Sequence, residues 1–346
     1  MTKIAFFDAK PYDKPGFEKY GPPAGIEFKY YESKLDADTA GLAEGCAGVV
    51  AFVNDSLNAP TLQRLYDMGI RLVALRCAGF NNVDLKTACG KMHVVRVPAY
   101  SPYAVAEHAM AMLLTSIRRI HKAYNRTREF NFSLNGLTGF DLHGKSVGVI
   151  GTGKIGKVFI NICRGFGMIV SAYDPYPDPS AGIRYVTLGE LFAQSDILSL
   201  HCPLTSQTQH IINAETISQM KKGVVIINTS RGGLIDAEAL TEGIKNKQVG
   251  AACLDVYEEE SELFYEDNSG HILQDDVLAR LISMPNVLLT SHQAFLTEEA
   301  LNNIAEVTVR NISAFLKGEK LENEICYQNL PVSYTHLRAH ETEADL

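Results

Sequence analysis

The sequence predicts an α/β protein with two parallel-sheet domains. Its 346 residues correspond to about two domains of roughly 150 residues each. Short apolar runs alternate with helix-like segments in both halves of the chain, and this alternation favours parallel sheets. Hydrophobic residues make up 46% of the chain and charged residues 21%, which excludes a disordered protein and predicts a sizeable core.

The first hundred residues contain the five expected strands of one domain. Their apolar runs lie at residues 4–7, 26–31, 49–53, 72–75 and 94–97, and Pro98 ends the last run. Ser101 and Pro102 then predict a helix start, because serine is a favoured N-cap and proline fits the first helical position. Apolar residues continue on a broad face of this helix to about Tyr124, so we expect one long helix here.

A second strand–helix series begins at Ser146. Its strand-like runs lie at residues 147–150, 168–173, 197–200, 224–228, 251–255 and 287–290, and another helix is expected from Glu298 to about Leu316. We expect residues 1–100 and 299–330 to form one domain, residues 101–298 to form a second domain inserted into it, and a cleft to separate them. Residues 331–346 show no apolar period long enough to dock, so a non-native or disordered tail is expected there.

Charge and cysteine content exclude several classes of protein. The net charge of −8 argues against nucleic-acid binding, because phosphate contacts need clustered Lys and Arg. The seven cysteines are odd in number and contain no C-x-x-C pair, which favours reduced thiols in a cytoplasmic protein over a disulfide framework or a metal site. No segment approaches the run of about 20 apolar residues that a membrane helix needs, so no membrane partner is expected.

The sharpest local signal is the motif G-T-G-K-I-G at residues 151–156. An apolar strand runs directly into it and a helix pattern follows, which is the context of a dinucleotide-binding loop. Gly151 permits the tight turn, Gly153 leaves room for a pyrophosphate, and Gly156 lets the helix approach the strand. The helix N-terminus, at Lys154 and Ile155, would direct free N–H groups at the phosphates.

Asp174 ends the strand that follows the glycine motif. A carboxylate at this place accepts hydrogen bonds from a ribose diol and repels a 2′-phosphate, so NAD(H) is favoured over NADP. The alternative is a plain strand-end turn before Pro175. Together with the glycines, Asp174 predicts that the inserted domain is Rossmann-like.

Candidate catalytic groups follow other strand ends. His292, His201 and Arg231 come directly after apolar runs, at the sheet edge where ligands bind in open α/β folds. Glu260 lies just beyond another strand, and a carboxylate against an imidazole would raise the histidine pKa and fix its tautomer. Each residue also has a structural reading: a histidine can cap a sheet, Arg231 can be a surface residue of a Gly-rich turn, and Glu260 can be a solvated acid.

Six sequence blocks carry a resemblance. From Lys3 to about Leu330 the chain resembles the D-isomer-specific 2-hydroxyacid dehydrogenases, and closely the fermentative D-lactate dehydrogenases among them. The blocks are LRCAGFNNVD at 75–84, VPAYSP at 97–102, VIGTGKIG at 149–156, NTSRG at 228–232, DVYE at 255–258 and SHQAF at 291–295. The resemblance implies two Rossmann-like or flavodoxin-like domains.

The resemblance also implies roles for individual residues. Arg231 would bind the substrate carboxylate and carbonyl, His292 would be the acid/base and Glu260 its partner. It implies that backbone N–H groups around Ala78 and Gly79 hold the substrate carboxylate and that Tyr100 and Phe295 shape the substrate pocket. The nicotinamide side would be lined by Pro203, Thr229 and Asp255. Ser291 departs from the family pattern, because many relatives have proline before the histidine; this leaves the loop freer.

The activity implied is NADH-dependent reduction of pyruvate, a small 2-oxo acid, to D-lactate. Two alternatives stay open, namely reduction of a larger 2-oxo acid and an NAD(H)-sensing scaffold or corepressor of the same fold. The resemblance further implies a homodimer or homotetramer built on the long helix after Ser101, although burial within one subunit explains the apolar face of that helix equally well.

Overall fold

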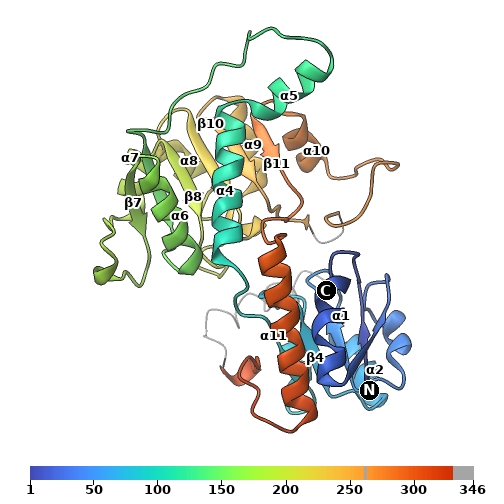
Figure 1. Ribbon diagram of the computed structural model, residues 1–346. Helices are drawn as coiled ribbons and strands as arrows, with labels where there is room; N and C mark the ends of the chain where they lie inside the picture. Colours follow the sequence, from blue (N-terminus) through green and yellow to red (C-terminus); the bar gives the residue numbers. More distant parts are fainter. Residues whose placement is uncertain (261–262, 330–346) are drawn as a thin grey trace, which may run out of the picture. The chain divides into compact units, whose positions relative to one another are not determined.

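The computed structural model describes residues 1–260 and 263–329 and contains two compact units (Figure 1). Among the described residues, unit 1 comprises residues 1–101 and 295–329, and unit 2 comprises residues 102–294. Along the sequence, unit 2 is therefore an insert in unit 1. The domain bounds expected from the sequence, residues 1–100, 101–298 and 299–330, stay a prediction. The tail expected at residues 331–346 lies outside the described residues.

Unit 1 is built on a five-stranded parallel sheet. The strands are β1 (Thr2–Phe6), β2 (Ile26–Tyr30), β3 (Gly48–Ala51), β4 (Leu72–Leu75) and β5 (His93–Val95), in the order β2-β1-β3-β4-β5. Its helices are α1 (Lys14–Tyr20), α2 (Ala59–Asp67), α3 (Leu85–Ala88) and α11 (Glu298–Leu316). Residues 323–325 pair with β5, where Ile325 N donates to Val94 O at 2.8 Å. The C-terminal segment thus returns to the sheet of its own unit.

Unit 2 is built on a six-stranded parallel sheet. The strands are β6 (Ser146–Ile150), β7 (Ile169–Tyr173), β8 (Ile197–Leu200), β9 (Val224–Asn228), β10 (Val249–Leu254) and β11 (Val287–Leu289), in the order β11-β10-β9-β8-β6-β7. Its helices are α4 (Pro102–Ile117), α5 (Ile120–Arg128), α6 (Lys154–Gly165), α7 (Leu188–Gln194), α8 (Ala214–Gln219), α9 (Ala237–Lys245) and α10 (Asp276–Ser283). Both sheets confirm the predicted fold class, and every expected strand is present.

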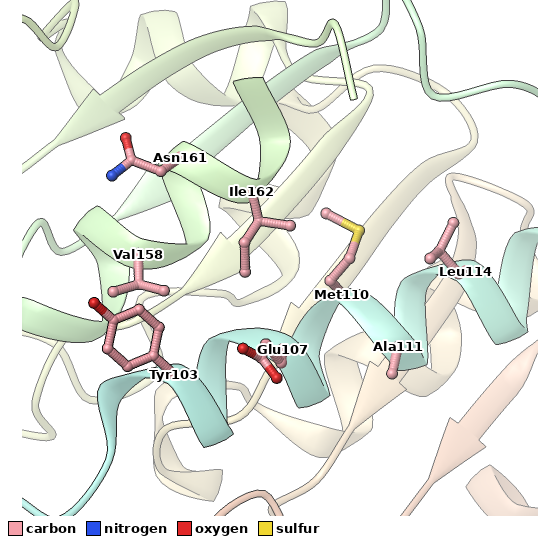
Figure 2. A pocket seen from close by; sticks show the side chains of 8 residues that line it. All are labelled: Tyr103, Glu107, Met110, Ala111, Leu114, Val158, Asn161 and Ile162. Atoms are coloured by element: carbon pink, nitrogen blue, oxygen red, sulfur yellow. The ribbon is translucent and has the colours of Figure 1, made fainter. Parts of the chain in front are cut away.

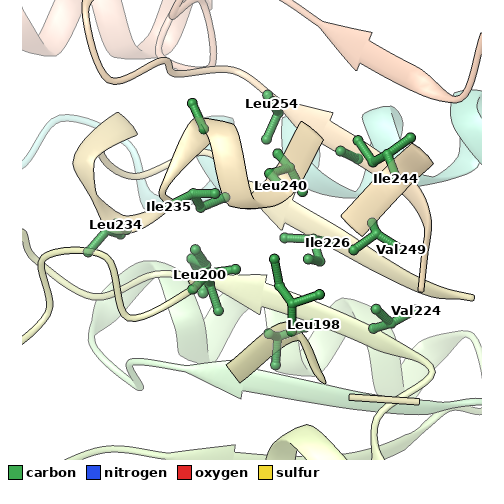
Figure 3. Packing of buried hydrophobic residues seen from close by; sticks show 14 of the residues in the cluster. Leu198, Leu200, Val224, Ile226, Leu234, Ile235, Leu240, Ile244, Val249 and Leu254 are labelled. Carbon is green, nitrogen blue, oxygen red and sulfur yellow. The ribbon is translucent and has the colours of Figure 1, made fainter. Parts of the chain in front are cut away.

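Helices cover both faces of the unit 2 sheet, which explains its nearly continuous apolar strands. In β9, Val225 and Ile227 point into the core formed with α4 and α6, whereas Val224 and Ile226 point into the opposite core with α8 and α9 (Figure 3). Alternate residues of a strand face opposite sides of a sheet, so a strand buried on both sides needs apolar residues throughout. The loops at the strand ends are therefore free to carry the polar site.

The single helix expected from residue 103 to about residue 124 is wrong: it is two helices, α4 and α5. Between them Arg119 adopts the left-handed conformation with φ of 55°, which breaks the helix. The chain then forms an extended arm, residues 120–141, that leaves the body of unit 2 (Figure 1). The arm returns at Gly139, where a side chain would collide with the Ile117 carbonyl oxygen at 2.2 Å. Among the described residues, no helix is long and apolar enough to cross a bilayer.

Candidate active site

The glycine motif lies where the strand order of unit 2 reverses. The chain passes from β6 to β7 on one side and then to β8 on the other side of β6, and such a switch point opens a ligand crevice. Gly151 has φ of +94°, and a side chain there would lie 2.7 Å from the backbone of His201 and Cys202. At Gly156 a side chain would lie 2.1 Å from the Gly151 carbonyl oxygen, whereas at Gly153 it would meet no described atom within 4 Å. Two glycines thus permit the turn and the helix packing, and the third leaves open space.

Asp174 is held at the tip of β7 by the glycine loop itself. Its Oδ2 accepts hydrogen bonds from Thr152 N at 2.7 Å and Thr152 Oγ1 at 2.9 Å, and its Oδ1 accepts one from Tyr176 N at 2.9 Å. These bonds orient the carboxylate beside the loop and leave acceptor lone pairs for ribose hydroxyls. The arrangement fits the adenosine end of NAD(H).

The other proposed cofactor residues lie around the same crevice. Lys154 and Ile155 begin α6, whose N-cap Gly153 offers no side-chain hydrogen bond to the first amides, and these remain available for phosphates. Thr229 follows β9, and its Oγ1 is buried without a hydrogen-bond partner among the described residues. A buried orphan hydroxyl is unusual and suits a site completed by a ligand. Pro203 is exposed in the loop after β8.

His292 and Glu260 form the central contact of the candidate active site. His292 follows β11 and Glu260 follows the neighbouring β10, and His292 Nδ1 lies 2.6 Å from Glu260 Oε1. The second oxygen, Glu260 Oε2, accepts a hydrogen bond from Tyr257 N at 3.0 Å. An ionised carboxylate can only accept, so Nδ1 carries a proton and Nε2 is left for a substrate.

The backbone of His292 is strained, and its neighbours hold it in that state. Its φ of 52° lies in the left-handed region, which non-glycine residues rarely adopt. His292 N donates to the Asp255 carbonyl oxygen at 2.6 Å, and Tyr265 Oη donates to the His292 carbonyl oxygen at 3.1 Å. The imidazole is thereby directed by the backbone as well as by Glu260.

Asp255 is fully buried and pins the loop that carries His292. Its Oδ1 accepts from Thr290 Oγ1 at 2.6 Å and Gln293 N at 2.9 Å, and its Oδ2 accepts from Ala294 N at 2.8 Å. His108 Nε2 of α4 lies 3.3 Å from Oδ1. Burial alone would raise the pKa of Asp255, but the contacts with His108, Thr290 and Gln293 outweigh it, so its pKa lies below the usual value. Sequence reasoning missed His108, although it is a polar residue on a largely apolar helix.

Arg231 follows β9, the strand adjacent to β10. Asn228 Nδ2 donates to the Arg231 carbonyl oxygen at 2.8 Å, and the guanidinium Nη1 donates to the Ser230 carbonyl oxygen at 2.7 Å. Ser230 Oγ in turn donates to the Cys202 carbonyl oxygen at 2.6 Å. Arg231, Glu260 and His292 therefore follow three adjacent strands of one sheet within unit 2.

Unit 1 holds the other proposed substrate residues. Ala78 and Gly79 follow β4, and their backbone N–H groups donate to no group among the described residues. Arg96 Nη1 donates to the Ala78 carbonyl oxygen at 2.8 Å and fixes this loop. Two adjacent amides without an acceptor among the described residues suit the binding of an anion.

Phe295 lies among three aromatic residues of unit 1. Its ring centroid is 6.3 Å from Tyr100, 6.1 Å from Phe52 and 6.5 Å from Tyr12. Tyr100 is further held by Asn303 Nδ2, which donates to its carbonyl oxygen at 2.7 Å. The sequence indicated Tyr100 and Phe295 but not Tyr12, in the turn before α1, or Phe52, at the end of β3, because only the fold brings these two residues to the Phe295 ring.

His201, the other strand-end histidine, has a structural environment. Its Nε2 lies 2.9 Å from Ser199 Oγ, and its ring lies 4.9 Å from the Phe159 ring. Burial lowers the pKa of His201 to about 4, so the imidazole is neutral near pH 7. Its protonated form is then too scarce for His201 to act as the general acid. Among the described residues, no cluster of three or more His, Cys, Asp or Glu could hold a metal ion.

Comparison with known proteins identifies the relatives of this chain. Residues 110–294 match the family of D-isomer specific 2-hydroxyacid dehydrogenases, in the NAD binding domain. The D-lactate dehydrogenase of Escherichia coli is 51% identical over 327 residues, which cover 93% of this chain and 99% of that protein.

Solved structures agree with this assignment. The structure described as the pyruvate reductase of Chlamydomonas reinhardtii superposes with a TM-score of 0.89 at 44% identity, covering 93% of this chain and 98% of that one. The NAD-complexed D-isomer specific 2-hydroxyacid dehydrogenase of Lactobacillus delbrueckii ssp. bulgaricus gives a TM-score of 0.79 at 28% identity, covering 94% and 100%. Unit 2 is therefore an NAD(H)-binding unit.

Two glycine substitutions should separate binding from folding. Gly153→Val places its side chain in open space, so we expect an unchanged melting temperature and an NADH Kd raised about tenfold or more, because the new methyl groups occupy the approach of the pyrophosphate. Gly156→Val should instead lower the melting temperature, because its side chain collides with Gly151. Differential scanning fluorimetry and NADH fluorescence titration measure the two effects. Normal NADH affinity in Gly153→Val would contradict the assignment of this loop.

Proposed function

Because the chain belongs to the D-isomer-specific 2-hydroxyacid dehydrogenase family, we propose that it reduces pyruvate to D-lactate with NADH. The observation that carries this proposal is the contact of 2.6 Å between His292 Nδ1 and Glu260 Oε1, next to the strand that presents Arg231. A histidine held by a carboxylate is a suitable proton donor, and a guanidinium is a suitable ligand for an anionic substrate. Bound NADH would supply the hydride that the carbonyl carbon accepts.

His292 would protonate the carbonyl oxygen of the substrate from Nε2. Glu260 stabilises the imidazolium before the transfer and holds the ring after it, since Nδ1 stays hydrogen-bonded throughout. The left-handed backbone of His292 and the hydrogen bond from its N–H to the Asp255 carbonyl oxygen hold the ring in one orientation before the substrate binds. General acid catalysis of this kind contributes typically about 10²–10⁴ in rate.

Arg231 would bind the carboxylate and stabilise the negative charge that develops on the carbonyl oxygen. That charge is larger in the transition state than in the bound substrate, so the interaction lowers the barrier and does more than improve binding. In unit 1, the amides of Ala78 and Gly79 would also bind a carboxylate, which is the role that the family resemblance implies for them. Thr229, Pro203 and Asp255 would lie on the nicotinamide side, with Asp255 acting through the backbone it fixes.

The aromatic cluster around Phe295 supports a small substrate. Tyr12, Phe52 and Tyr100 surround this ring with bulky, stiff side chains, and such a wall suits the methyl group of pyruvate better than a branched chain.

A panel of 2-oxo acids tests the proposed function. NADH oxidation should be fastest with pyruvate and should fall by about tenfold or more with 2-oxo acids of branched side chain, because a hydrophobic pocket discriminates by roughly 1–3 kcal/mol per methylene. Chiral chromatography should find D-lactate as the product. Faster turnover of a larger 2-oxo acid would redirect the substrate assignment, and L-lactate would contradict the family chemistry.

Replacement of His292 tests its role as proton donor. His292→Asn should lower kcat by about 10²–10⁴, since general acid catalysis is lost, while asparagine tolerates the left-handed backbone better than alanine does. The NADH Kd should stay within about twofold, because the phosphate and ribose sites are untouched. Stopped-flow absorbance and fluorescence titration give the two constants. A variant with nearly normal turnover would show that another group supplies the proton.

Unit 2 also has an apolar groove that supports self-association. Met110, Ala111 and Leu114 of α4 and Val158 and Ile162 of α6 line a groove of about 540 Å³ (Figure 2). The arm of the same unit carries the exposed Phe130, Phe132 and Leu134. In a two-fold dimer the same patch of each copy takes part in the contact. The groove of one copy and the arm of the other would therefore cover each other, and the reverse contact would form at the same time. We propose a homodimer, or a homotetramer built from it, through α4, α6 and the arm.

Charged substitutions on this surface should weaken the dimer. Ala111→Arg adds charge at an exposed position of α4, so we expect monomers at micromolar concentration with an unchanged fold. Ile272→Glu, at another exposed apolar residue of unit 2, is the matched control and should remain assembled. Sedimentation velocity distinguishes the species. A wild-type monomer, or equal assembly of both variants, would refute this interface.

The thiols support a reducing compartment. None of the seven cysteines forms a disulfide, and burial raises the pKa of both Cys163 and Cys253 to about 12, which keeps them as unreactive thiols. A chain with seven cysteines and no disulfide among them suits a cytoplasmic location, which we therefore propose.

A further inference from the structure

A second histidine–carboxylate pair joins three loops at the active-site edge of unit 2. His210 belongs to the loop after β8, and its Nε2 contacts Glu258 Oε1 in the loop after β10. His210 N donates to the Gly233 carbonyl oxygen at 2.9 Å in the loop after β9, and Asn213 Nδ2 donates to the His210 carbonyl oxygen at 2.9 Å. One residue thus holds the segments that follow β8, β9 and β10.

Gly232 shows how closely these loops approach each other. A side chain at Gly232 would lie 2.0 Å from the carbonyl carbon and oxygen of Tyr257 and 2.4 Å from Glu258 N. The turn that carries Arg231 therefore rests on the peptide that joins Tyr257 to Glu258. The His210–Glu258 contact joins the loop after β8 to the residue that contributes the nitrogen of this peptide.

The same short turn presents Glu260 to His292. Tyr257 N donates to Glu260 Oε2 at 3.0 Å, while Glu260 Oε1 lies 2.6 Å from His292 Nδ1. Glu258 lies inside this turn, between the backbone donor and the carboxylate. Any movement of the turn away from Gly232 would change the position of Glu260.

We propose that His210 and Glu258 are a positioning pair that holds the Tyr257–Glu260 turn against Gly232 and so keeps Glu260 on His292. The inference rests on the proposed function. It assigns neither residue to the substrate or the cofactor: both act through Glu260.

The exposure of the pair favours positioning over stabilisation. The side chains of His210 and Glu258 are 36% and 31% exposed, and such ion pairs typically contribute only about 0–1 kcal/mol to stability. Yet His210 adopts a left-handed backbone with φ of 48°, which is unfavourable for a histidine. A strained residue that adds little stability, beside a catalytic turn, is consistent with an orienting role.

Removal of either partner should lower turnover without loss of the fold. In Glu258→Ala and in His210→Phe we expect kcat for pyruvate to fall about 10- to 100-fold, because displacement of a catalytic group by about 1 Å can have effects of this size. The NADH Kd and the melting temperature should change little. Glu258→Gln and His210→Gln keep a hydrogen bond between the two side chains and should recover most of the lost kcat. A fall in melting temperature with normal kcat would overturn the proposal in favour of a structural role.

The Glu260→Gln background gives the sharpest test. If the pair acts through Glu260, then Glu258→Ala should reduce kcat by less than about twofold in that background, since residues that act as a unit are not additive. The same 10- to 100-fold loss in both backgrounds would overturn the proposal.

Unit 1 provides a matched control pair. His93 Nδ1 lies 2.6 Å from Glu324 Oε1, with side chains 49% and 37% exposed, and this pair joins β5 to the C-terminal segment. His93→Phe should leave kcat unchanged, and a comparable loss there would refute a specific role for His210. Failure of the proposed function would appear differently, as wild-type protein that does not turn over pyruvate.

Discussion

The buried carboxylate of Asp255 is the constraint on which the active-site geometry depends. A charge at a fully buried position is costly unless hydrogen bonds satisfy it, and Asp255 obtains these from Thr290, Gln293 and Ala294. The donors can reach it only when the chain after β11 turns sharply back over β10. That turn includes His292 in its left-handed conformation, so the strained backbone of the proposed proton donor lies between residues whose groups bind the Asp255 carboxylate.

The residues proposed to react and the residues proposed to recognise the substrate belong to different units. Arg231, Glu260 and His292 follow adjacent strands of unit 2, where the rigid sheet sets their spacing, whereas Ala78, Gly79, Tyr100 and Phe295 belong to unit 1. The groups proposed to react are thus fixed by one core and one set of loop contacts. The groups proposed to recognise the carboxylate and side chain of the substrate rest on the other core.

The strands could be predicted from the sequence because a parallel strand that is buried on both faces, such as β9, consists almost entirely of apolar residues. The sequence also indicated the glycine loop, since the conformation of Gly151 and the contact at Gly156 demand glycine. It did not reveal the break at Arg119, because an arginine in left-handed conformation has no compositional signature. His108 and His210 were missed for another reason: their carboxylate partners lie far away in sequence, and only the folded sheet brings them together.

The contacts of Asp255 have a consequence for modular design. His108 lies near the start of α4, by which the chain enters unit 2, and Ala294 is the last residue before it leaves; both contact the same carboxylate. The entry and exit of the insert are therefore tied together from within, as in domains that tolerate transfer between hosts. Residues 102–294 are thus joined near their two ends by one buried side chain, so we expect this segment to keep the relative positions of Arg231, Glu260 and His292 when it is grafted into a different host domain.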